Sequence, residues 1–543
     1  MEDQNNNEYR NQRIENMEKL SELGFSSYKE NFKRSGRLKD LLNNFELNNP
    51  VSACGRILTI RKMGKMAFAH INDGSAKFQI MVKKDQIGEV SFNAFKLLDI
   101  GDIIGVDGNY FLTKTEEKTI SVNSWVLLTK SLLPFPEKFH GLSDKEIRYR
   151  QRSLDLITNS ETQRLFRNRT KIIKEIRNFL DENDFMEVET PMLQQIPGGA
   201  TAKPFQSYYN ALNTDVYMRI APELYLKRLI VGGLDRVYEL NRNFRNEGID
   251  RTHNPEFTCL EIYQAYGDMR SMQQLIKRLF HHVAENVFQT KEFSWMGHTI
   301  NIEHDWEEIT YENLIIKHLG NDWFSRDVSF ATNEAIKRDV KIDPSMNFQE
   351  ITHEIYEKNI EPQLIQPTFV TRLPAYLVPL AKRCSDNEAF VDVFELIIAG
   401  KEIAPAYSEL NDPIDQKNRF ENQVEGNYDL IDYDFLTALE YGMPPTSGIG
   451  IGIDRLVMLM TNNSSIQEVL FFPQMKPEKK KLSLNENEST VLSLLQKEKT
   501  EINNVKQNSG LSNKGWDKTI KSLRKLNLID VEKINEIVYI SKK

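Results

Sequence analysis

The stretch Arg219–Tyr266, RIAPELYLKRLIVGGLDRVYELNRNFRNEGIDRTHNPEFTCLEIYQAY, decides the fold of this chain. Pro222 and Glu223 predict a helix start, because proline lacks only an N–H that the first turn leaves free and a carboxylate is favoured at the positive end of the helix dipole. Two runs of alternating character follow and predict strands at 236–245 and 257–266. Asn-Glu-Gly and Asn-Pro between them supply turn chemistry. We therefore expect a helix followed by an antiparallel hairpin.

One face of this hairpin carries polar and aromatic side chains. Because side chains alternate between the two faces of a strand, six residues share that face: Asn241, Asn243, Arg245, Phe257, Glu261 and Tyr263. The opposite face, with Tyr238, Leu240 and Phe244, is expected to join a core. Such a polar face is typical of a binding site. The alternative, a half-exposed hairpin whose charges are merely solvated, is not excluded by periodicity alone.

The string FRNEGIDRTHNPEFT, residues 244–258, resembles the second signature motif of class II aminoacyl-tRNA synthetases, most closely that of the lysine enzymes. The resemblance covers nearly all of residues 10–475. It implies an enzyme that activates L-lysine with ATP, releasing pyrophosphate, and transfers lysine from lysyl-adenylate to the 3′ end of tRNA(Lys).

Composition and charge are those of a soluble globular enzyme. Of 543 residues, 40% are hydrophobic and 27% are charged, with a net charge of −8, and this length predicts about three or four domains. No apolar run approaches the roughly 18 residues that a membrane span requires, and the N-terminus has no apolar signal region, so we expect a cytoplasmic protein without a membrane partner. Cys54, Cys259 and Cys384 lie far apart and support neither a zinc site nor a disulfide framework.

A small β-barrel is predicted at 49–133, after an N-terminal helical segment at 1–48. Its five β-rich runs are separated by glycine and asparagine turns, and they lie at 51–64, 66–73, 76–83, 102–111 and 119–128. The OB-fold is a barrel of this size that binds single-stranded nucleic acid. Within the resemblance it is the anticodon-binding domain, and four positions match its reading residues: Arg61, Phe68, Gln79 and Glu117. The competing interpretation of Phe68 is a side chain that fills the barrel.

The catalytic domain is expected at 159–475, after a linker or hinge at 134–158. A helix at 167–183 with the following FMEVETPML resembles the first class II motif, which implies a homodimer. A helical insertion is expected at roughly 275–365. The string GMPPTSGIGIGIDRLVMLM, residues 442–460, resembles the third motif, and its glycines alternate with isoleucines to give a strand with one bare face against which an adenine can lie.

Two carboxylates suggest a cation site. Glu395 and Glu402 lie on either side of a small turn, so a hairpin would bring them to within about one residue of cross-strand register. Such neighbours repel each other unless a cation lies between them, and Mg²⁺ held by carboxylates and substrate phosphates is the expected occupant. Salt bridges to Lys401 or Arg383 are the alternative.

The resemblance also assigns roles to single residues. It implies catalytic roles for Arg245 and Arg455. ATP would be bound by Arg245, Glu247, His253, Asn254, Phe257, Glu395 and Arg455. Lysine would be bound by Gly199, Glu223, Arg245, Glu261, Tyr263 and Glu409. Glu261, Glu409 and the Tyr263 hydroxyl form an acidic pocket that suits an ε-ammonium group, and this disfavours the related aspartate and asparagine enzymes.

One position departs from the family pattern. Pro405 stands in EIAPAYSEL where the family usually has an asparagine that contacts the lysine carboxylate. Proline offers neither a side-chain donor nor an N–H, so the sequence predicts weaker lysine binding or a slightly different grip.

Residues 476–543 form an extension beyond the catalytic resemblance. With 15 Lys and Arg against 9 Asp and Glu, a net of +6, it is basic, and its order of two or three short helices and a hairpin resembles a winged helix. An RNA-binding or partner-binding module and an inert appendage are both open interpretations.

The predicted fold class of the whole chain is α+β, with an OB-fold barrel, an antiparallel catalytic sheet flanked by helices and this extension. The rival functions are a catalytically weak RNA-binding or regulatory paralogue and a lysine ligase acting on another acceptor.

Overall fold

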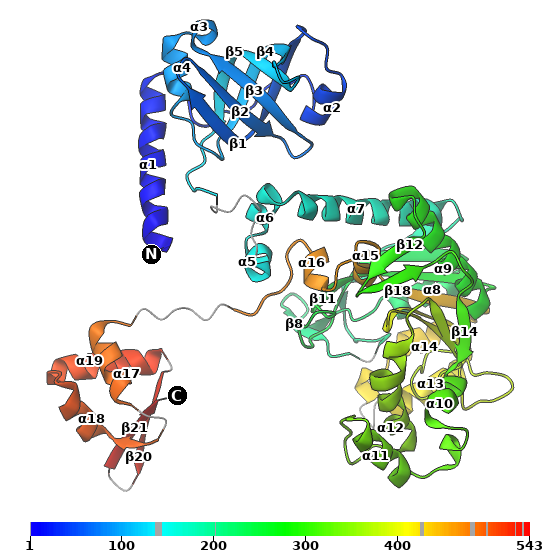
Figure 1. Ribbon diagram of the computed structural model, residues 1–543. Coiled ribbons are helices and arrows are strands. Elements are labelled where there is room, and N and C mark those ends of the chain that lie inside the picture. The colour runs from blue at the N-terminus through cyan, green and yellow to red at the C-terminus, as the bar shows by residue number, and fades with distance from the viewer. Residues whose placement is uncertain are drawn as a thin grey trace. The chain divides into compact units, whose positions relative to one another are not determined.

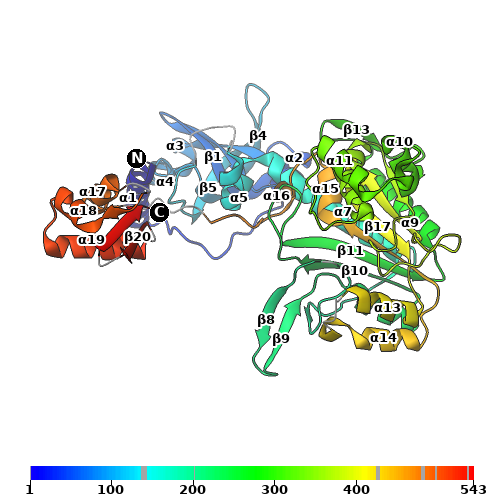
Figure 2. The ribbon, with the colours of Figure 1, turned by 90° about the horizontal axis from the view of Figure 1, so that it is seen from below.

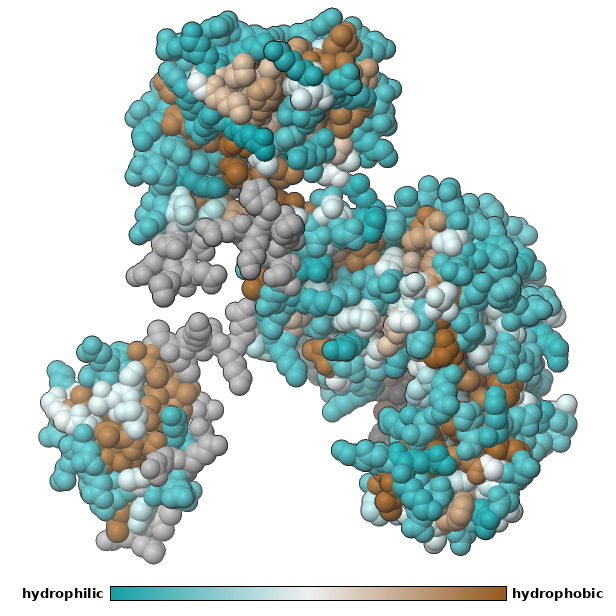
Figure 3. All heavy atoms as spheres, viewed as in Figure 1, coloured by the Kyte–Doolittle hydropathy of each residue, from teal (hydrophilic) through white to brown (hydrophobic). Residues whose placement is uncertain are grey.

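The computed structural model describes residues 2–135, 144–200, 202–423, 428–477, 484–495, 498–526, 528–534 and 537–542. The chain divides into two compact units, Met1–Gln474 and Met475–Lys543 (Figure 1). Part of the expected hinge, residues 136–143, lies outside the described residues. No helix in the described part of the chain is long and apolar enough to cross a membrane, and most of the surface seen in Figure 3 is hydrophilic.

The five predicted barrel strands all form, and they close a barrel in the order β1-β2-β3-β5-β4. They are β1 (Pro50–Met63), β2 (Met66–Asn72), β3 (Lys77–Lys83), β4 (Ile103–Leu112) and β5 (Lys118–Thr129). Around them lie α1 (Glu2–Glu22), α2 (Leu38–Asn43), α3 (Lys84–Ile87) and α4 (Glu89–Phe95). Alternate residues of each strand point inward and build one apolar core that includes Ile57, Ile71 and Ile80.

The catalytic part is built on an eight-stranded sheet with the order β14-β15-β16-β17-β18-β11-β10-β6. Its strands are β6 (Met186–Glu187), β10 (Arg236–Phe244), β11 (Glu256–Ala265), β14 (Glu307–Thr310), β15 (Thr368–Thr371), β16 (Val393–Ile398), β17 (Lys401–Ser408) and β18 (Thr446–Gly452). The six central strands are antiparallel, as predicted, but β14 pairs with β15 and β6 pairs with β10 in parallel. The sheet is therefore mixed, and long connections that contain helices separate both outer pairs in sequence.

Helices cover the two faces of this sheet unequally. The apolar face packs against α7 (Ser160–Asp181), α9 (Met269–Val283) and α15 (Ile453–Met460). On the other face, α8 (Glu223–Val231) and α14 (Tyr433–Glu440) cover only one end. The rest of this second face holds the polar residues of the β10–β11 hairpin that line a cavity.

Shorter elements complete the unit. They are α5 (Lys145–Arg150), α6 (Arg152–Thr158), β7 (Leu193–Gln194), β8 (Phe205–Tyr209), β9 (Thr214–Met218), α13 (Pro413–Gln423), the 3₁₀ turn Tyr428–Leu430 and α16 (Ile466–Val469). The strands β7, β9 and β8 form a small separate sheet, and Figure 2 shows the β8–β9 hairpin extending away from the main sheet.

The region expected to be a helical insertion is not purely helical. It contains α10 (Tyr311–Leu319), α11 (Val328–Lys337), α12 (Phe348–Ile355), the π-helical turns Ala284–Phe288 and Tyr356–Ile360 and the 3₁₀ turns Trp323–Ser325 and Glu361–Gln363. It also contains β14 and a hairpin of β12 (Glu292–Trp295) and β13 (His298–Asn301). That hairpin forms because Phe293, Trp295 and Ile300 alternate into the main core while Met296 and Gly297 adopt the positive φ of a tight turn.

The second unit has its own core. Its elements are α17 (Glu486–Leu494), β19 (Thr500–Glu501), α18 (Ile502–Ser509), α19 (Asn513–Lys525), β20 (Ile529–Ile534) and β21 (Ile537–Lys542). The three strands form a sheet in the order β19-β21-β20. Val491, Trp516, Leu523 and Ile540 lie among the buried residues that hold these elements together.

Candidate active site

A cavity of about 440 Å³ opens on the polar face of the central sheet. Strands β10, β11, β17 and β18 and the loop between β10 and β11 line it. Most of the residues that the sequence singled out lie in its wall: Gly199, Glu223, Arg245, Glu247, His253, Asn254, Phe257, Glu261, Tyr263, Glu402 and Arg455. Glu395 and Glu409 do not belong to the wall.

The register of the hairpin places the predicted residues on one face. Asn243 pairs with Phe257, and Glu261 pairs with Glu239, so their side chains share the cavity side of the sheet. Glu261 is only 7% exposed and Asn243 only 1%. The alternative of a hairpin with merely solvated charges is therefore wrong.

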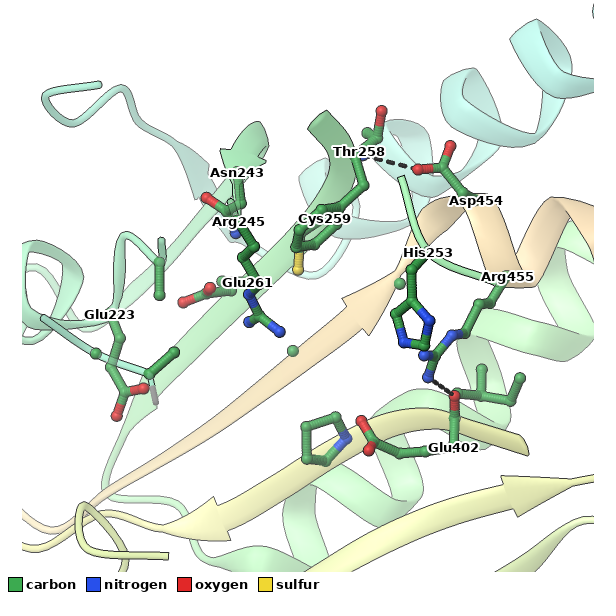
Figure 4. A pocket seen from close by; sticks show the side chains of 18 of the residues that line it. Glu223, Asn243, Arg245, His253, Thr258, Cys259, Glu261, Glu402, Asp454 and Arg455 are labelled. Carbon is green, nitrogen blue, oxygen red and sulfur yellow. Dashed lines mark hydrogen bonds between the residues drawn. The ribbon is translucent and has the colours of Figure 1, made fainter. Parts of the chain in front are cut away.

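Figure 4 shows a cavity with two ends. In that view Glu223 and Glu261 lie at one end, His253, Arg455 and Glu402 at the other, and Arg245 between them. The guanidinium carbon of Arg245 lies 5.2 Å from the centroid of the Phe257 ring. Its Nε is buried without a hydrogen-bond partner, so this guanidinium is available to an anionic ligand.

The acidic end is a network of carboxylates and phenols. The Tyr263 hydroxyl donates to Glu261 at 3.2 Å, and the Tyr407 hydroxyl donates to Glu223 at 3.1 Å. Burial and the nearby Glu223 carboxylate raise the pKa of Glu261 to about 8. Glu261 is therefore largely protonated at neutral pH until a cationic ligand favours its ionised form.

Lys227 is a residue of this end that sequence reasoning missed. Its Nζ lies 2.7 Å from Glu223 Oε1 and also forms an ion pair with Glu409, and all three side chains are buried. Burial lowers the pKa of Lys227, but the two carboxylates outweigh it and hold the pKa above its usual value. The available signal was the spacing of Glu223 and Lys227, one helical turn apart on a helix whose start had been predicted.

Glu409 is buried and is not one of the residues that line the cavity. Burial raises its pKa well above the usual value, and Lys227 offsets this only in part. Its carboxylate lies against Gly448, which lines the cavity, since a Cβ at Gly448 would overlap both Glu409 and the Tyr263 ring. A side chain at Gly448 is therefore incompatible with the present positions of both groups.

The other predicted lysine-site residue is Gly199, which has a φ of +86°. A Cβ at this position would lie 3.2 Å from the Cβ atoms of Ala221 and Glu223. Glycine therefore allows this loop to approach the start of α8 closely.

At the opposite end, backbone and acidic groups hold two basic side chains. Arg455 Nη1 donates to the carbonyl of Glu402 at 2.6 Å, and His253 Nδ1 lies 2.8 Å from Asp250 Oδ2. Asn254 donates to the carbonyl of Glu256 and accepts from the amide of Gln474, so its amide braces the loop. Glu247 is exposed at the rim.

A brace that the sequence did not reveal joins the second and third motifs. The buried Asp454 carboxylate accepts a hydrogen bond from the amide of Thr258 at 2.8 Å and forms an ion pair of 2.6 Å with Arg169 on α7. This fixes the start of α15, and hence Arg455, against β11.

The glycines of β18 line the cavity as predicted. Gly450 lies opposite Glu261 in the ladder, and a Cβ built there would have 4.0 Å to its nearest neighbour. Gly450 therefore leaves open space over the sheet. Pro405 also lines the cavity, and the β17–β18 ladder ends at the next residue, Ala406.

The two candidate metal ligands lie on adjacent strands. Glu395 pairs with Pro405, whereas Glu402 pairs with Ile397, two residues from Glu395, because the turn at Ala399 and Gly400 sets Ile398 opposite Lys401. A bulge beyond this pair adds one further residue on β17. The expected offset of about one residue is therefore too small. Burial and the neighbouring Glu402 and Glu361 raise the pKa of Glu395 well above its usual value.

Neither proposed salt bridge forms within the described part of the chain, and Arg383 instead pairs with Asp415. Oxygen donors without a cationic partner fit a hard cation such as Mg²⁺. Among the described residues no group of three or more His, Cys, Asp or Glu side chains is arranged to hold a metal ion. The pair would therefore depend on further ligands from a substrate.

Three of the four predicted anticodon positions lie on neighbouring strands of the barrel, and Glu117 directly precedes β5. Arg61 pairs directly with Phe68, and Phe68 lies outside the apolar core. Gln79 donates to Thr119 at 2.8 Å, and Glu117 lies 3.2 Å from Nε2 of His70, which pairs with Gln79 across the strands. The interpretation of Phe68 as a barrel-filling side chain is therefore wrong.

Comparisons with known proteins agree with this geometry. A profile of class II tRNA synthetases (D, K and N) matches residues 144–476, and a profile of the OB-fold nucleic acid binding domain matches residues 51–128. The chain is 49% identical to a lysine–tRNA ligase of Pelotomaculum thermopropionicum, over 87% of this chain and 95% of that protein. It is 48% identical to one of Carboxydothermus hydrogenoformans, over 88% of this chain and 100% of that protein. A lysine–tRNA ligase of Christiangramia forsetii is 46% identical over 91% of this chain and 90% of that protein. The chain therefore belongs to the class II tRNA synthetases of the D, K and N group.

Proposed function

We propose that this protein is a lysine–tRNA ligase, which activates L-lysine with ATP and transfers it to tRNA(Lys). The observation that carries the choice of amino acid is the charge at the acidic end of the cavity. Glu223, Glu261 and Glu409 are buried there, and Lys227 is the cation paired with two of them. Lysine, with its α- and ε-ammonium groups, supplies the missing positive charge, whereas a neutral or acidic side chain leaves a carboxylate uncompensated.

The chemistry requires positioning more than acid–base catalysis. A lysine carboxylate oxygen attacks the α-phosphorus of ATP, the bond to the β-phosphate breaks, and pyrophosphate leaves. A ribose hydroxyl of the terminal tRNA adenosine then attacks the carbonyl carbon of lysyl-adenylate, and AMP leaves. Arg245 lies between the two ends of the cavity, where it can bind both the carboxylate and the α-phosphate.

The roles that we propose for the remaining residues in binding lysine and ATP follow from their positions at the two ends of the cavity. Glu223, with the backbone near Gly199, binds the α-ammonium, and Glu261 and Tyr263, supported by Glu409, bind the ε-ammonium. For ATP, Phe257 and Arg455 flank the adenine over the bare face of β18. His253 reaches the outer phosphates, and Glu247 and Asn254 hold the nucleotide loop.

Glu395 and Glu402 would hold Mg²⁺ together with the ATP phosphates. Their adjacent strands and the lack of a salt bridge to either carboxylate among the described residues support this assignment. When bound, the ion would neutralise phosphate charge and orient the pyrophosphate leaving group.

The barrel is proposed to bind the anticodon. Phe68 would stack on a base of the anticodon, with Arg61, Gln79 and Glu117 contacting backbone and base edges. The outward position of Phe68 and the hydrogen-bond network around His70 support this role. A tRNA substrate also favours the cytoplasm as the place of action.

A homodimer is proposed from exposed apolar side chains around β6 to β9. Large hydrophobic residues there are 48–62% exposed: Met186, Met192, Leu193, Tyr208, Tyr209 and Leu212. A patch of this kind is typical of an interface.

The domain limits predicted from the sequence remain part of the proposal. So does the assignment of the second unit as a winged helix, which its helices and its strand order support.

Lysine-dependent ATP–pyrophosphate exchange on the purified protein, without tRNA, tests the activity. We expect exchange with lysine, and none with ornithine, arginine, aspartate or asparagine at the same concentration. Exchange followed by no charging of tRNA(Lys) would favour a ligase for another acceptor. Exchange with no amino acid would favour the catalytically weak paralogue, for which Pro405 is the main support.

A further inference from the structure

The second unit differs from the rest of the chain in the sign of its charge. Residues 476–543 carry 15 basic and 9 acidic residues, a net of +6, whereas residues 1–475 carry 55 and 69, a net of −14. The synthetase profile ends at residue 476, so the activity of that family does not account for this unit.

Helix α19 concentrates the positive charge on one face. Lys514, Lys518, Lys521 and Lys525 follow one another at intervals of four, three and four residues, and all four are exposed. At about 100° per residue, this spacing places them in one stripe along the helix. We call these four residues the lysine stripe.

The stripe faces away from the core of the unit. Trp516, Thr519 and Leu523 are the buried residues of α19, and the helical period puts them on the opposite side from the lysine stripe. Among the described residues, no lysine of the stripe forms an ion pair, while the nearby Lys499 pairs with Glu532. The stripe is therefore an exposed cationic surface whose helix is anchored by its other face.

The length of the stripe identifies the class of ligand. From Lys514 to Lys525 it extends about 16 Å at the rise of an α-helix, which is longer than a single phosphate or carboxylate. A row of cations on this scale suits a polyanion whose charges repeat along a backbone.

The surrounding topology points to a nucleic acid. A break of three residues, Gly510 to Ser512, joins α18 to α19, and the β20–β21 hairpin follows directly. In helix-turn-helix proteins the second helix lies against the double helix. The exposed Lys533 and Lys542 on the hairpin add charge of the same sign.

We propose that the lysine stripe of α19 binds the phosphate backbone of a double-helical stem of tRNA. The choice of tRNA rests on the proposed function, because a unit attached to a tRNA ligase meets that RNA at a high effective concentration. The major groove of A-form RNA is too deep and narrow for side chains to read bases, so the contact is to phosphates and independent of sequence.

The test uses the full chain with Lys514→Gln, Lys518→Gln and Lys521→Gln. We expect the KM for tRNA(Lys) to rise about tenfold at moderate salt, with kcat and tRNA-independent exchange unchanged. We also expect the slope of log binding constant against log salt to fall in magnitude by about 2 to 3, because three phosphate contacts are lost. Replacement of the same residues by arginine keeps the charge and restores binding.

The matched control removes equal charge from exposed lysines of the first unit, by Lys317→Gln, Lys341→Gln and Lys358→Gln, and should leave the KM unchanged. Equal KM values and salt slopes for stripe and control variants would overturn the proposal. The proposal would also be overturned if the stripe variant lost binding to duplex DNA but bound tRNA as tightly as the wild type does. Exchange without tRNA reports on the catalytic cavity alone. Absence of exchange in the wild-type protein would therefore count against the proposed function rather than against the lysine stripe.

Discussion

Nζ of Lys227 lies 2.7 Å from Oε1 of Glu223, one turn away on the same helix, and both side chains are buried. Glu409, which reaches the same ammonium from the start of the segment after β17, is also buried. A cation supplied by the protein thus holds two of the three carboxylates at the acidic end of the cavity. This arrangement fixes them before any substrate arrives.

Replacement of Lys227 by methionine should destabilise the protein by about 3 to 5 kcal/mol, because it leaves buried carboxylates without their partner. Urea unfolding measures this change in free energy. The same experiment on Lys317→Met, an exposed lysine, should give a change within about 0.5 kcal/mol. Adding Glu409→Gln to the Lys227 variant should recover part of the loss, and equal stabilities of wild type and single variant would contradict the role of the pair.

The affinity for lysine should depend on pH through Glu261. Its pKa of about 8 in the free cavity means that lysine binding at pH 7 displaces a proton from this carboxyl group. The binding constant should therefore rise by up to about tenfold per pH unit below pH 8 and level off above it. Calorimetry in buffers of different ionisation enthalpy measures the released proton. Glu261→Gln should lower that release, and a wild type that releases no proton would contradict the assignment.

Removal of one carboxylate of the proposed cation pair should change the Mg²⁺ requirement. With Glu402→Gln, the Mg²⁺ concentration that half-saturates exchange should rise by about tenfold or more, because the ion loses one of few protein ligands. Glu388→Gln, at an exposed site, is the control. An unchanged Mg²⁺ titration for Glu402→Gln would remove this residue from the site.

The proline at position 405 should weaken the binding of the lysine carboxylate. Pro405→Asn restores a donor in the cavity wall and should lower the KM for lysine by about tenfold, the value of one hydrogen bond to a charged group. Steady-state exchange kinetics measure it. A low KM in the wild type that does not change in the variant would show that the proline has no effect on lysine binding.

Anticodon recognition should depend on Phe68. Phe68→Ala removes one stacking platform and should weaken tRNA binding by about 1 to 3 kcal/mol. Charging kinetics should show a raised KM for tRNA, while lysine-dependent exchange stays at the wild-type rate. Loss of exchange in this variant would instead indicate damage that reaches the catalytic part.

Much of the site was predictable because it lies on one hairpin. The period of two places Asn243, Arg245, Phe257 and Glu261 on one face without knowledge of any other strand. The five barrel strands were equally visible, since each alternates and ends at a turn. Only the packing of the barrel core showed that Phe68 lies outside it.

Contacts between distant segments decided the rest. The turn and the bulge between β16 and β17 set the offset of Glu395 and Glu402, and long connections allowed the outer strand pairs to be parallel. Burial of Lys227 between α8 and the segment after β17 could not be read from local spacing, because it depends on the packing of that helix against the sheet. The sequence by itself determined the barrel strands and the faces of the hairpin, since these follow from local periodicity and residue type, and its resemblance to a known family indicated the chemistry. The tertiary structure decided which charges are buried and paired, because desolvation and ion pairing depend on neighbours that are far apart along the chain.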